Sequence, residues 1–197
     1  MNQPDDDGGL KEQIRLQATR LFAQRGFAGT SMRELVEACE CTKAACYYYF
    51  SSKEALYRDV VQENAMRIHP LMQAMMTGPG SIRERLHTGL DAIVDFSIAN
   101  PRSMQLMQRI DLTSEDNAPA FSELPSRKTH LCQITELVVE GTKNGELRRD
   151  MDPDSGALIL TGAMQIQFDA GIASGEWDRE RMHKTIDLVL DGIANDE

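Results

Sequence analysis

Patterns that build β-sheets are almost absent from the sequence, because β-branched residues rarely alternate with polar ones along its 197 residues. Helix start and stop signals recur instead. Low-complexity tracts are missing, and the apolar runs, such as 157–160, are too short to cross a bilayer. We therefore expect an all-α globular protein that has no membrane partner.

Signals for export and for a disulfide scaffold are missing too. The first ten residues, MNQPDDDGGL, are acidic and polar, without the basic region and apolar stretch of a signal peptide. Three of the four cysteines crowd into residues 39–46, which is no framework for the disulfides of a secreted domain. We expect a cytoplasmic protein.

Catalytic signatures are also absent. The sequence has no nucleophile elbow, no phosphate-binding glycine loop and no paired carboxylates. The four histidines are dispersed without metal-ligand spacing: His69, His87, His130 and His183. We expect no catalytic residues, no cofactor and no metal, and hence no enzyme.

The charge of the chain is unevenly distributed. Its formal net charge is −10, which by itself disfavours binding to nucleic acid. Residues 10–58 nevertheless hold eight Lys/Arg against five Asp/Glu, whereas residues 59–197 hold thirteen against twenty-three. This asymmetry predicts that only the N-terminal part approaches DNA, and a solvated imbalance without function is the alternative.

Four helices are expected in the first seventy residues. Gly26 ends the first, because glycine reaches the left-handed conformation cheaply. Capping boxes, each a serine followed three residues later by glutamate, open the second helix at Ser31 and the fourth at Ser51, and Thr42 can cap the third. The expected helices are 10–25, a short one from 31, 42–49, and 51 to just before Pro70.

Five more helices are expected in the rest of the chain. Another capping box opens a helix at Ser81, Asp152 followed by Pro153 opens a later one, and Asp178 can cap the last. The expected helices are 81–100, 102–112, 126–143, one from 152, and 178–194, with loops at 76–80 and 113–125.

The segment SMRELVEACECTKAACYYYFSSKEAL combines a short helix, a tight turn and a second short helix that leads directly into a longer one. This is the helix-turn-helix pattern, at about residues 31–50, in which the second short helix can enter the major groove of DNA. Cys46 and Phe50, four residues apart, should face inward. Four residues of the same helix are then left facing outward: Lys43, Ala44, Tyr47 and Tyr48.

The stretches RLFAQRGFAGTSMREL and TKAACYYYFSSKEALY, in this order, resemble the DNA-binding domain of the TetR family of transcriptional regulators over residues 10–58. The resemblance implies a disordered tail at 1–9, a three-helix helix-turn-helix DNA-binding domain at 10–58, and a larger helical ligand-binding and dimerisation domain at 59–197. It also implies a bacterial homodimer, nucleoid-associated when bound, that represses transcription and leaves a near-palindromic double-stranded operator when a small-molecule effector binds.

By the same resemblance, ten residues match positions that contact DNA. In the family, the matching positions have three kinds of role. They contact phosphates or neighbouring bases (here Thr30, Ser31 and Arg33), read bases (Thr42, Lys43, Ala44 and Ala45) or contact the DNA backbone (Tyr47, Tyr48 and Lys53). The roles are physically sensible, because Lys and Arg neutralise phosphate while hydroxyls fix register. Under the alternative interpretation, some of the ten are merely solvated.

The motif departs from the family pattern in its turn and beneath its second helix. The turn usually carries Gly where this chain has Glu40, and a non-Gly residue in the left-handed conformation costs roughly 1 kcal/mol. Cys41 and Cys46 stand where the family more often has Val and Leu. With Cys39 they allow a redox-sensing hypothesis, although burial as small hydrophobic residues is the stronger interpretation.

The second domain carries thioether and aromatic side chains that suit an adaptable apolar effector pocket, with plain core packing as the alternative. The candidates are Met66, Met72, Met75, Met76, Phe96, Met104, Met107 and Phe121. The resemblance further implies that the last two helices pair across a two-fold axis. The candidates for this dimer interface are Leu158, Ile159, Ile186, Val189, Leu190 and Ile193.

Two alternatives keep the helix-turn-helix fold and differ in function. One is a DNA-binding protein with no effector, for which no small molecule would release the operator. The other is an adaptor for a protein partner that has lost operator recognition.

Overall fold

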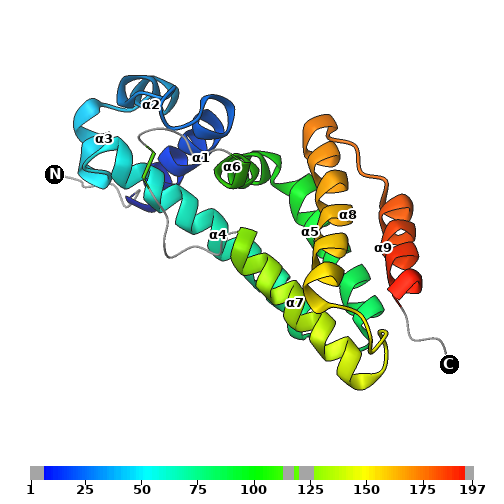
Figure 1. The fold of residues 1–197 in the computed structure, drawn as a ribbon. Helices are drawn as coiled ribbons and strands as arrows, with labels where there is room; N and C mark the ends of the chain where they lie inside the picture. Colours follow the sequence, from blue (N-terminus) through cyan, green and yellow to red (C-terminus); the bar gives the residue numbers. More distant parts are fainter. Residues whose placement is uncertain (1–6, 113–117, 120–126, 194–197) are drawn as a thin grey trace. The chain divides into compact units, whose positions relative to one another are not determined.

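The computed structural model describes residues 7–112, 118–119 and 127–193, and its regular elements are all helices (Figure 1). In chain order they are α1 (Asp7–Arg25), α2 (Met32–Ala38), α3 (Lys43–Tyr49), α4 (Lys53–Thr77), α5 (Ile82–Ala99), α6 (Pro101–Leu112), α7 (Arg127–Asn144), α8 (Pro153–Ser174) and α9 (Arg179–Ile193). The predicted all-α class is confirmed. Over the described ranges, no helix is both long and apolar enough to span a membrane.

Side-chain caps fix most of the helix starts that the sequence predicts. The capping boxes at Ser31 and Ser81 both form, with the serine hydroxyl and the glutamate three residues on each accepting a backbone N–H. Thr42 and Asp152 cap α3 and α8 through their side-chain oxygens. Asp178 accepts a 2.9 Å bond from the N–H three residues on and so caps α9.

The start and the end of α4 differ from the prediction. Its cap is Ser52, whose hydroxyl accepts a 3.1 Å bond from the N–H three residues on, and not Ser51. The helix also continues past Pro70, where the sequence predicts its end. A proline inside a helix leaves the carbonyl four residues earlier without its usual bond. That carbonyl belongs to Met66, whose side chain is 64% exposed, so water can reach this side of the helix.

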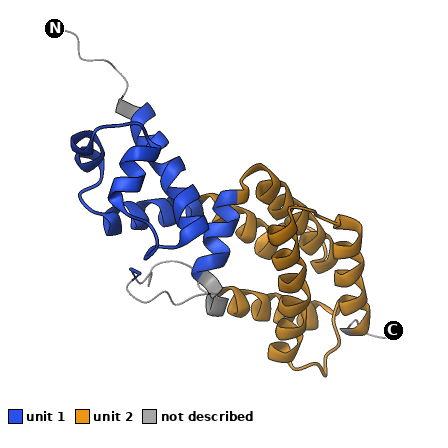
Figure 2. Cartoon of the chain, turned by 90° about the horizontal axis from the view of Figure 1, so that it is seen from above, with its two compact units in different colours: residues 1–66, 102–124 blue, residues 67–101, 125–197 orange. Residues whose placement is uncertain are grey.

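The chain forms two compact units (Figure 2). α1 begins at Asp7, three residues before its predicted start and inside the segment expected to be a tail, while residues 1–6 lie outside the described part. The predicted helix-turn-helix domain, 10–58, lies wholly within the first unit. Unit 1 comprises residues 1–66 and 102–124, and unit 2 comprises residues 67–101 and 125–197.

Unit 1 is built around one apolar core. α1 contributes Ile14, Ala18 and Phe22 at the helical spacing that the sequence predicts. The ring of Tyr57 in α4 packs edge-on against Phe22, with 4.8 Å between ring centroids. Leu106 of α6 is fully buried in the same core, although residues 67–101 separate α6 from the rest of the unit along the chain. Burial of Leu106 is the physical reason that α6 belongs to unit 1.

Unit 2 contains the C-terminal part of α4 with α5, α7, α8 and α9. α8 packs on both α7 and α9, and α9 also packs on α5 (Figure 1). Two glycines allow close approaches. A Cβ atom on Gly89 would lie 2.4 Å from the Cβ of Met75, and one on Gly171 would lie 2.6 Å from the ring of Trp177. Larger residues at either position would separate the packed elements.

Candidate nucleic-acid interface

The turn between α2 and α3 requires one residue in the left-handed region. That residue is Glu40, with φ +50°, as its place in the motif predicts. The N–H of Cys41 donates to the carbonyl of Val36 at 3.3 Å and closes α2. Gln13 of α1 donates its side-chain N–H to the carbonyl of Cys39 at 3.1 Å. The first helix therefore fixes the turn that aims α3.

The start of α2 is held by the carboxylate of Glu34. One of its oxygens accepts bonds from the N–H and the hydroxyl of Ser31, at 2.9 and 2.8 Å. The other oxygen pairs with Arg25 at 2.6 Å. The hydrogen bonds from Ser31, with a smaller contribution from Arg25, hold the pKa of Glu34 below its ordinary value. Ser31 lies at the surface, but its hydroxyl already serves the cap of α2.

The side chains of α3 divide as the sequence predicts. Cys46 is fully buried and Phe50, just after the helix, is 4% exposed, so both face the core of unit 1. Ala45 is half-buried. The exposed residues form what we call the outer face of α3: Lys43, Ala44, Tyr47 and Tyr48.

The outer face of α3 combines one cation, two phenols and one small side chain. The ammonium of Lys43 lies 5.7 Å from the centroid of the Tyr47 ring. The ring of Tyr48, which is 76% exposed, packs edge-on against Tyr49 with centroids 5.1 Å apart. Ala44 leaves room for base edges to approach, while the ammonium and the hydroxyls can contact phosphate. This chemistry suits the major groove of DNA.

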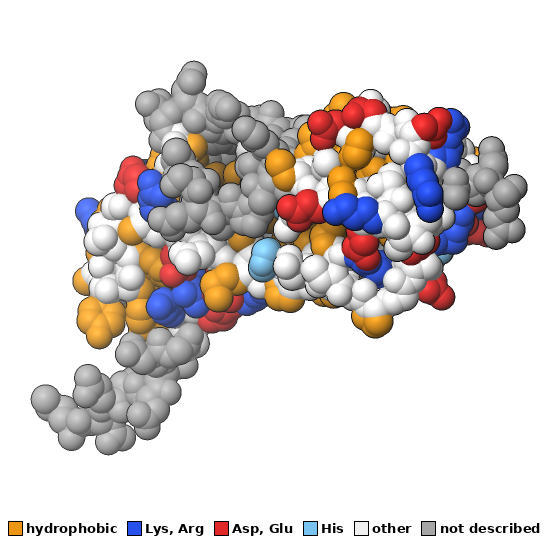
Figure 3. Space-filling model, turned by 60° about the horizontal axis from the view of Figure 1, so that its bottom comes forward, with side chains coloured by type: hydrophobic (Ala, Val, Ile, Leu, Met, Phe, Trp, Pro, Cys, Tyr) orange, Lys and Arg blue, Asp and Glu red, His pale blue; other side chains and the backbone are white. Residues whose placement is uncertain are grey.

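The basic side chains at the end of α1 and on α2 lie close to carboxylates, as Arg25 does to Glu34. Arg33 of α2 has an 85% exposed side chain and lies 3.7 Å from the carboxylate of Glu37. The face drawn in Figure 3 likewise shows basic and acidic side chains interspersed. Any DNA contact would therefore depend on a few named cations, whose attraction is short-ranged at physiological ionic strength.

Two of the ten predicted contact residues are engaged inside unit 1. Thr30 is buried, and its hydroxyl donates to the carbonyl of Gly26 at 2.8 Å. The ammonium of Lys53 donates to the carbonyl of Phe27 at 2.8 Å. The other eight residues are exposed or half-buried. Thr30 and Lys53 thus hold the turn between α1 and α2 in place.

The sequence did not reveal the polar contacts between α1 and α4 that support the site. Arg15 donates two bonds to Asp59, at 2.6 and 3.0 Å, and this pairing holds the pKa of Arg15 above its ordinary value. The buried amide of Asn64 lies 3.5 Å from the hydroxyl of Thr19. More than forty residues separate the partners in each pair, so no local sequence pattern could have found them. They join α4 to the helix that supports the turn.

The three clustered cysteines line the core beneath α3. Cys39 and Cys46 are buried, and Cys41 is half-buried. Burial raises the pKa of the Cys39 thiol to about 12 and raises the pKa of Cys46 as well. Thiols with raised pKa values react slowly with oxidants, which favours the packing role. Among the described residues, no group of three or more His, Cys, Asp or Glu could hold a metal ion.

The structure does not gather the predicted pocket residues in one unit. Met72, Met75, Met76 and Phe96 belong to unit 2, where Met75 and Met76 are buried. Unit 1 holds the exposed Met66 and the half-buried Met104 and Met107, and Phe121 lies outside the described residues.

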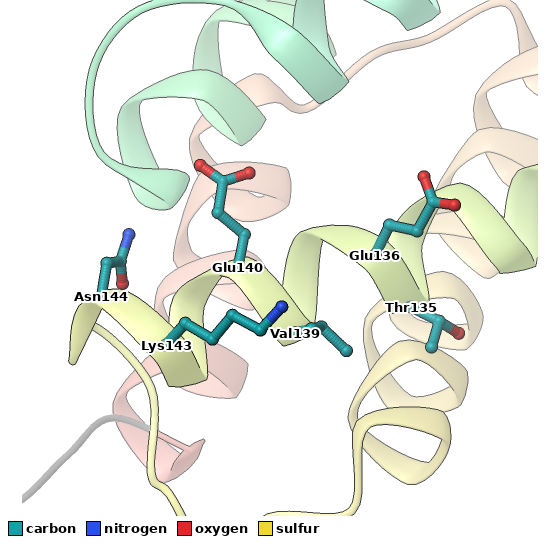
Figure 4. A pocket seen from close by; sticks show the side chains of 6 residues that line it. All are labelled: Thr135, Glu136, Val139, Glu140, Lys143 and Asn144. Atoms are coloured by element: carbon teal, nitrogen blue, oxygen red, sulfur yellow. The ribbon is translucent and has the colours of Figure 1, made fainter.

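One side of α7 bears an open cavity of about 540 Å³ (Figure 4). Its lining comes entirely from α7 and includes none of the predicted pocket residues. Glu140 on its rim pairs at 2.6 Å with Arg85, a buried arginine of α5. The lining residues are Thr135, Glu136, Val139, Glu140, Lys143 and Asn144. An open hollow lined by a single helix does not resemble the pocket of methionine and aromatic side chains expected for the effector.

The residues expected at the dimer interface fall into two groups. Leu158 and Ile159 of α8 are 59% and 51% exposed and are free to meet a partner. Ile186 and Leu190 of α9 are buried within unit 2 itself, Val189 is half-buried, and the side chain of Ile193 lies outside the described part. Two further apolar residues of these helices are exposed: Ile166 of α8 at 73% and Leu188 of α9 at 75%.

Comparisons with known proteins agree with this geometry. Residues 14–60 match the family described as bacterial regulatory proteins, tetR family. The transcriptional repressor KstR2 of Mycolicibacterium smegmatis is 23% identical over 158 residues, which cover 77% of this chain and 74% of that protein.

Two solved structures share the fold. The ketosteroid transcriptional regulator KstR2 of Mycobacterium tuberculosis has a TM-score of 0.73 at 19% identity, covering 99% of this chain and 98% of that one. The fatty acid degradation regulator FadR of Bacillus halodurans has a TM-score of 0.68 at 19% identity, covering 92% and 98%.

An all-α fold with an exposed recognition helix on a braced helix-turn-helix defines a DNA-binding transcriptional regulator. Residues 14–60 of the chain match the DNA-binding part of the TetR family of bacterial regulatory proteins. Regulators of this family bind operator DNA, act as dimers and respond to small-molecule effectors. They act by binding DNA and not by catalysis.

Proposed function

We propose that the chain is a homodimeric repressor that binds a near-palindromic operator through two copies of α3 and leaves it when a small apolar molecule binds. The outer face of α3 carries the proposal. It is exposed, while the opposite side of the helix is anchored in the core by Cys46 and Phe50. A two-fold dimer presents two such helices, and this symmetry requires two matching half-sites.

The DNA contacts that we propose follow from the exposure of each side chain. Arg33, Lys43 and the two tyrosines would contact phosphates, while Thr42, Ala44 and Ala45 would meet base edges. Ser31 would lie against the DNA backbone at the start of α2. Thr30 and Lys53, whose polar groups bond to carbonyls of unit 1, would act mainly by positioning these contacts.

Dimerisation through α8 and α9 is supported by their exposed apolar residues. Ile159 and Ile166 lie seven residues apart on α8, with the exposed Gly162 between them, so they share one side of that helix. Leu188 adds an exposed apolar residue on α9, which packs beside α8. Large exposed apolar residues in neighbouring positions are typical of protein interfaces.

An apolar effector is supported by the thioether and aromatic side chains of unit 2. Met72 and Phe96 are half-buried, so they could meet a ligand without a complete rearrangement of the core. The two solved structures described above are named for ketosteroid and fatty acid regulation. A ketosteroid and a long-chain fatty acid are therefore the first probes to add to the complex of protein and operator.

Fluorescence anisotropy with a labelled operator duplex tests these contacts. The double variant Lys43→Ala with Tyr48→Ala should bind roughly a hundredfold more weakly, because each subunit loses contacts to DNA. The salt dependence of log K should also fall by about 0.9 for each lost phosphate contact. Lys184→Ala, an exposed lysine of α9 that pairs with Glu180, is the matched control and should bind like the wild type.

The same assay separates the alternatives. Release of the operator by a probe supports regulation by an effector, and a complex that no probe of a broad apolar panel releases supports the constitutive binder. Equal affinity of wild type and double variant for every duplex would support the adaptor. Binding to an operator would place the protein on the chromosome, with the nucleoid of a bacterial cell.

A further inference from the structure

Helices α5 and α9 carry the same pattern of charged residues. In each helix an arginine, a histidine and two aspartates follow one another at four-residue intervals, which places these four side chains along one face of the helix. The two helices pack against each other. The eight residues form what we call the α5–α9 ladder: Arg83, His87, Asp91 and Asp95 of α5, and Arg179, His183, Asp187 and Asp191 of α9.

The ion pairs of the ladder mirror each other. Arg83 pairs with both aspartates of α9, and Arg179 pairs with both aspartates of α5. Each arginine thus meets residues near the opposite end of the pattern on the other helix. The two helices therefore run antiparallel here, and the ladder has an approximate two-fold axis at its centre.

Two stacked histidines occupy that centre. The rings of His87 and His183 are nearly parallel, at 6°, with centroids 4.3 Å apart. Nε2 of His183 is hydrogen-bonded to the carboxylate of Asp91 at 3.1 Å. Nε2 of His87 lies 3.0 Å from the carboxylate of Asp187, without the geometry of a hydrogen bond. Both imidazoles are partly buried, with 25% and 29% of their side-chain surface exposed.

The charges of the ladder balance only when the histidines are protonated. Two arginines and four aspartates leave two negative charges uncompensated while both imidazoles are neutral. A proton added to either imidazole would lie beside a carboxylate of the other helix, and two protonated imidazoles would lie stacked against each other. Both acidic residues of α8, and Glu140 of α7, have partners outside the ladder. On α8, Asp154 and Asp169 bond to Thr135 and Gln165, and on α7 Glu140 pairs with Arg85.

We propose that the α5–α9 ladder is a proton-responsive clasp, in which proton uptake by the stacked histidine pair strengthens the attachment of α9 to α5. Imidazole is the ordinary side chain that changes its charge between about pH 5 and 8. All four histidines of the chain lie in unit 2 and none in unit 1. Acidification in this range would therefore act on unit 2 and leave the helix-turn-helix unit without a titrating histidine.

Thermal unfolding of the full chain tests the clasp. If the folded protein binds the proton more tightly than the unfolded chain, the stabilisation is present at low pH and is lost as pH rises. The wild-type Tm should fall by roughly 3 °C from about pH 5.5 to 8, above the range in which carboxylates titrate. The double variant His87→Gln with His183→Gln should lose this fall. His69→Gln, an exposed histidine outside the ladder, should keep it.

A second measurement needs no variant. The ring protons of His87 and His183, followed by NMR in the wild type, should both report the same two proton-binding steps, because neighbouring sites titrate as a pair. Independent single-step curves for the two rings would overturn the proposal. An equal pH dependence of Tm in the wild type and the double variant would overturn it as well.

Discussion

The ammonium of Lys53 donates a hydrogen bond to the carbonyl of Phe27 at 2.8 Å and lies 4.1 Å from the centroid of the Phe27 ring. One side chain at the start of α4 thus holds the turn that leads into α2. Because Phe27 itself packs against Tyr57 of α4, with ring centroids 5.0 Å apart, the turn is held by polar and apolar contacts together.

Replacing Lys53 with methionine removes the hydrogen bond and the cation–π contact but keeps a long apolar side chain. We expect the free energy of unfolding to fall by about 1 kcal/mol. The loss is modest because Lys53 is only half-buried, so water can donate to the carbonyl of Phe27 in its place. Urea unfolding measures this change. Lys43→Met, on the outer face of α3, should leave stability unchanged but weaken operator binding, and equal stability of the two variants would contradict the role of Lys53.

Glu40 occupies the left-handed region at φ +50°. Glu40→Gly should raise the free energy of unfolding by about 0.5–1 kcal/mol, because glycine adopts this conformation without a steric penalty. Glu40→Val should lower it, since a β-branched residue is strained there. Chemical denaturation of both variants measures these changes. If the side chain of Glu40 mattered and backbone strain did not, the two substitutions would change stability in the same direction.

Replacing Leu106 tests whether α6 supports the core of unit 1. Its side chain is fully buried in the core that contains Phe22 and Tyr57, so Leu106→Ala should cost about 2–5 kcal/mol. Leu16→Ala, at a leucine of α1 that is 66% exposed, should cost far less. Hydrogen exchange should also show faster opening of α1 in Leu106→Ala. Equal stability of the two variants would mean that α6 does not support this core.

Acid should weaken the capping box at Ser31. The pKa of Glu34 is lowered by its bonds to Ser31, so its contribution to stability is present above the ordinary carboxyl pKa and is lost as pH falls through the lowered value. Glu34→Gln should therefore lose less stability than the wild type between about pH 5 and 3. Thermal unfolding across this range measures the difference. Glu37→Gln, an exposed residue of the same helix that takes no part in the cap, should follow the wild type.

Features set by neighbours in sequence could be predicted. Ser31 and Thr42 cap their helices as expected, and Cys46 faces the core, because a cap or a helical face depends only on residues within about one turn. Pro70 misled the prediction because a helix tolerates a proline where the surroundings satisfy the freed carbonyl.

Features set by distant residues could not be predicted. The return of Leu106 to the first core depends on packing across about forty residues, which leaves no local pattern. The repeated arginine, histidine and aspartate pattern of α5 and α9 can be read in the sequence once it is known. The contact between His87 and His183, however, depends on the antiparallel packing of α5 and α9. The matching residues of these two helices lie 96 positions apart in the sequence.

Selection of bound sequences from random duplex DNA tests the central claim most directly. The wild type should enrich a near-palindrome whose half-site centres are separated by about one helical turn or a multiple of it. The double variant Lys43→Ala with Tyr48→Ala should enrich none, while Lys184→Ala should recover the wild-type sequence. Failure of the wild type to enrich any palindrome, or recovery of the same palindrome by the double variant, would contradict DNA recognition through the outer face of α3.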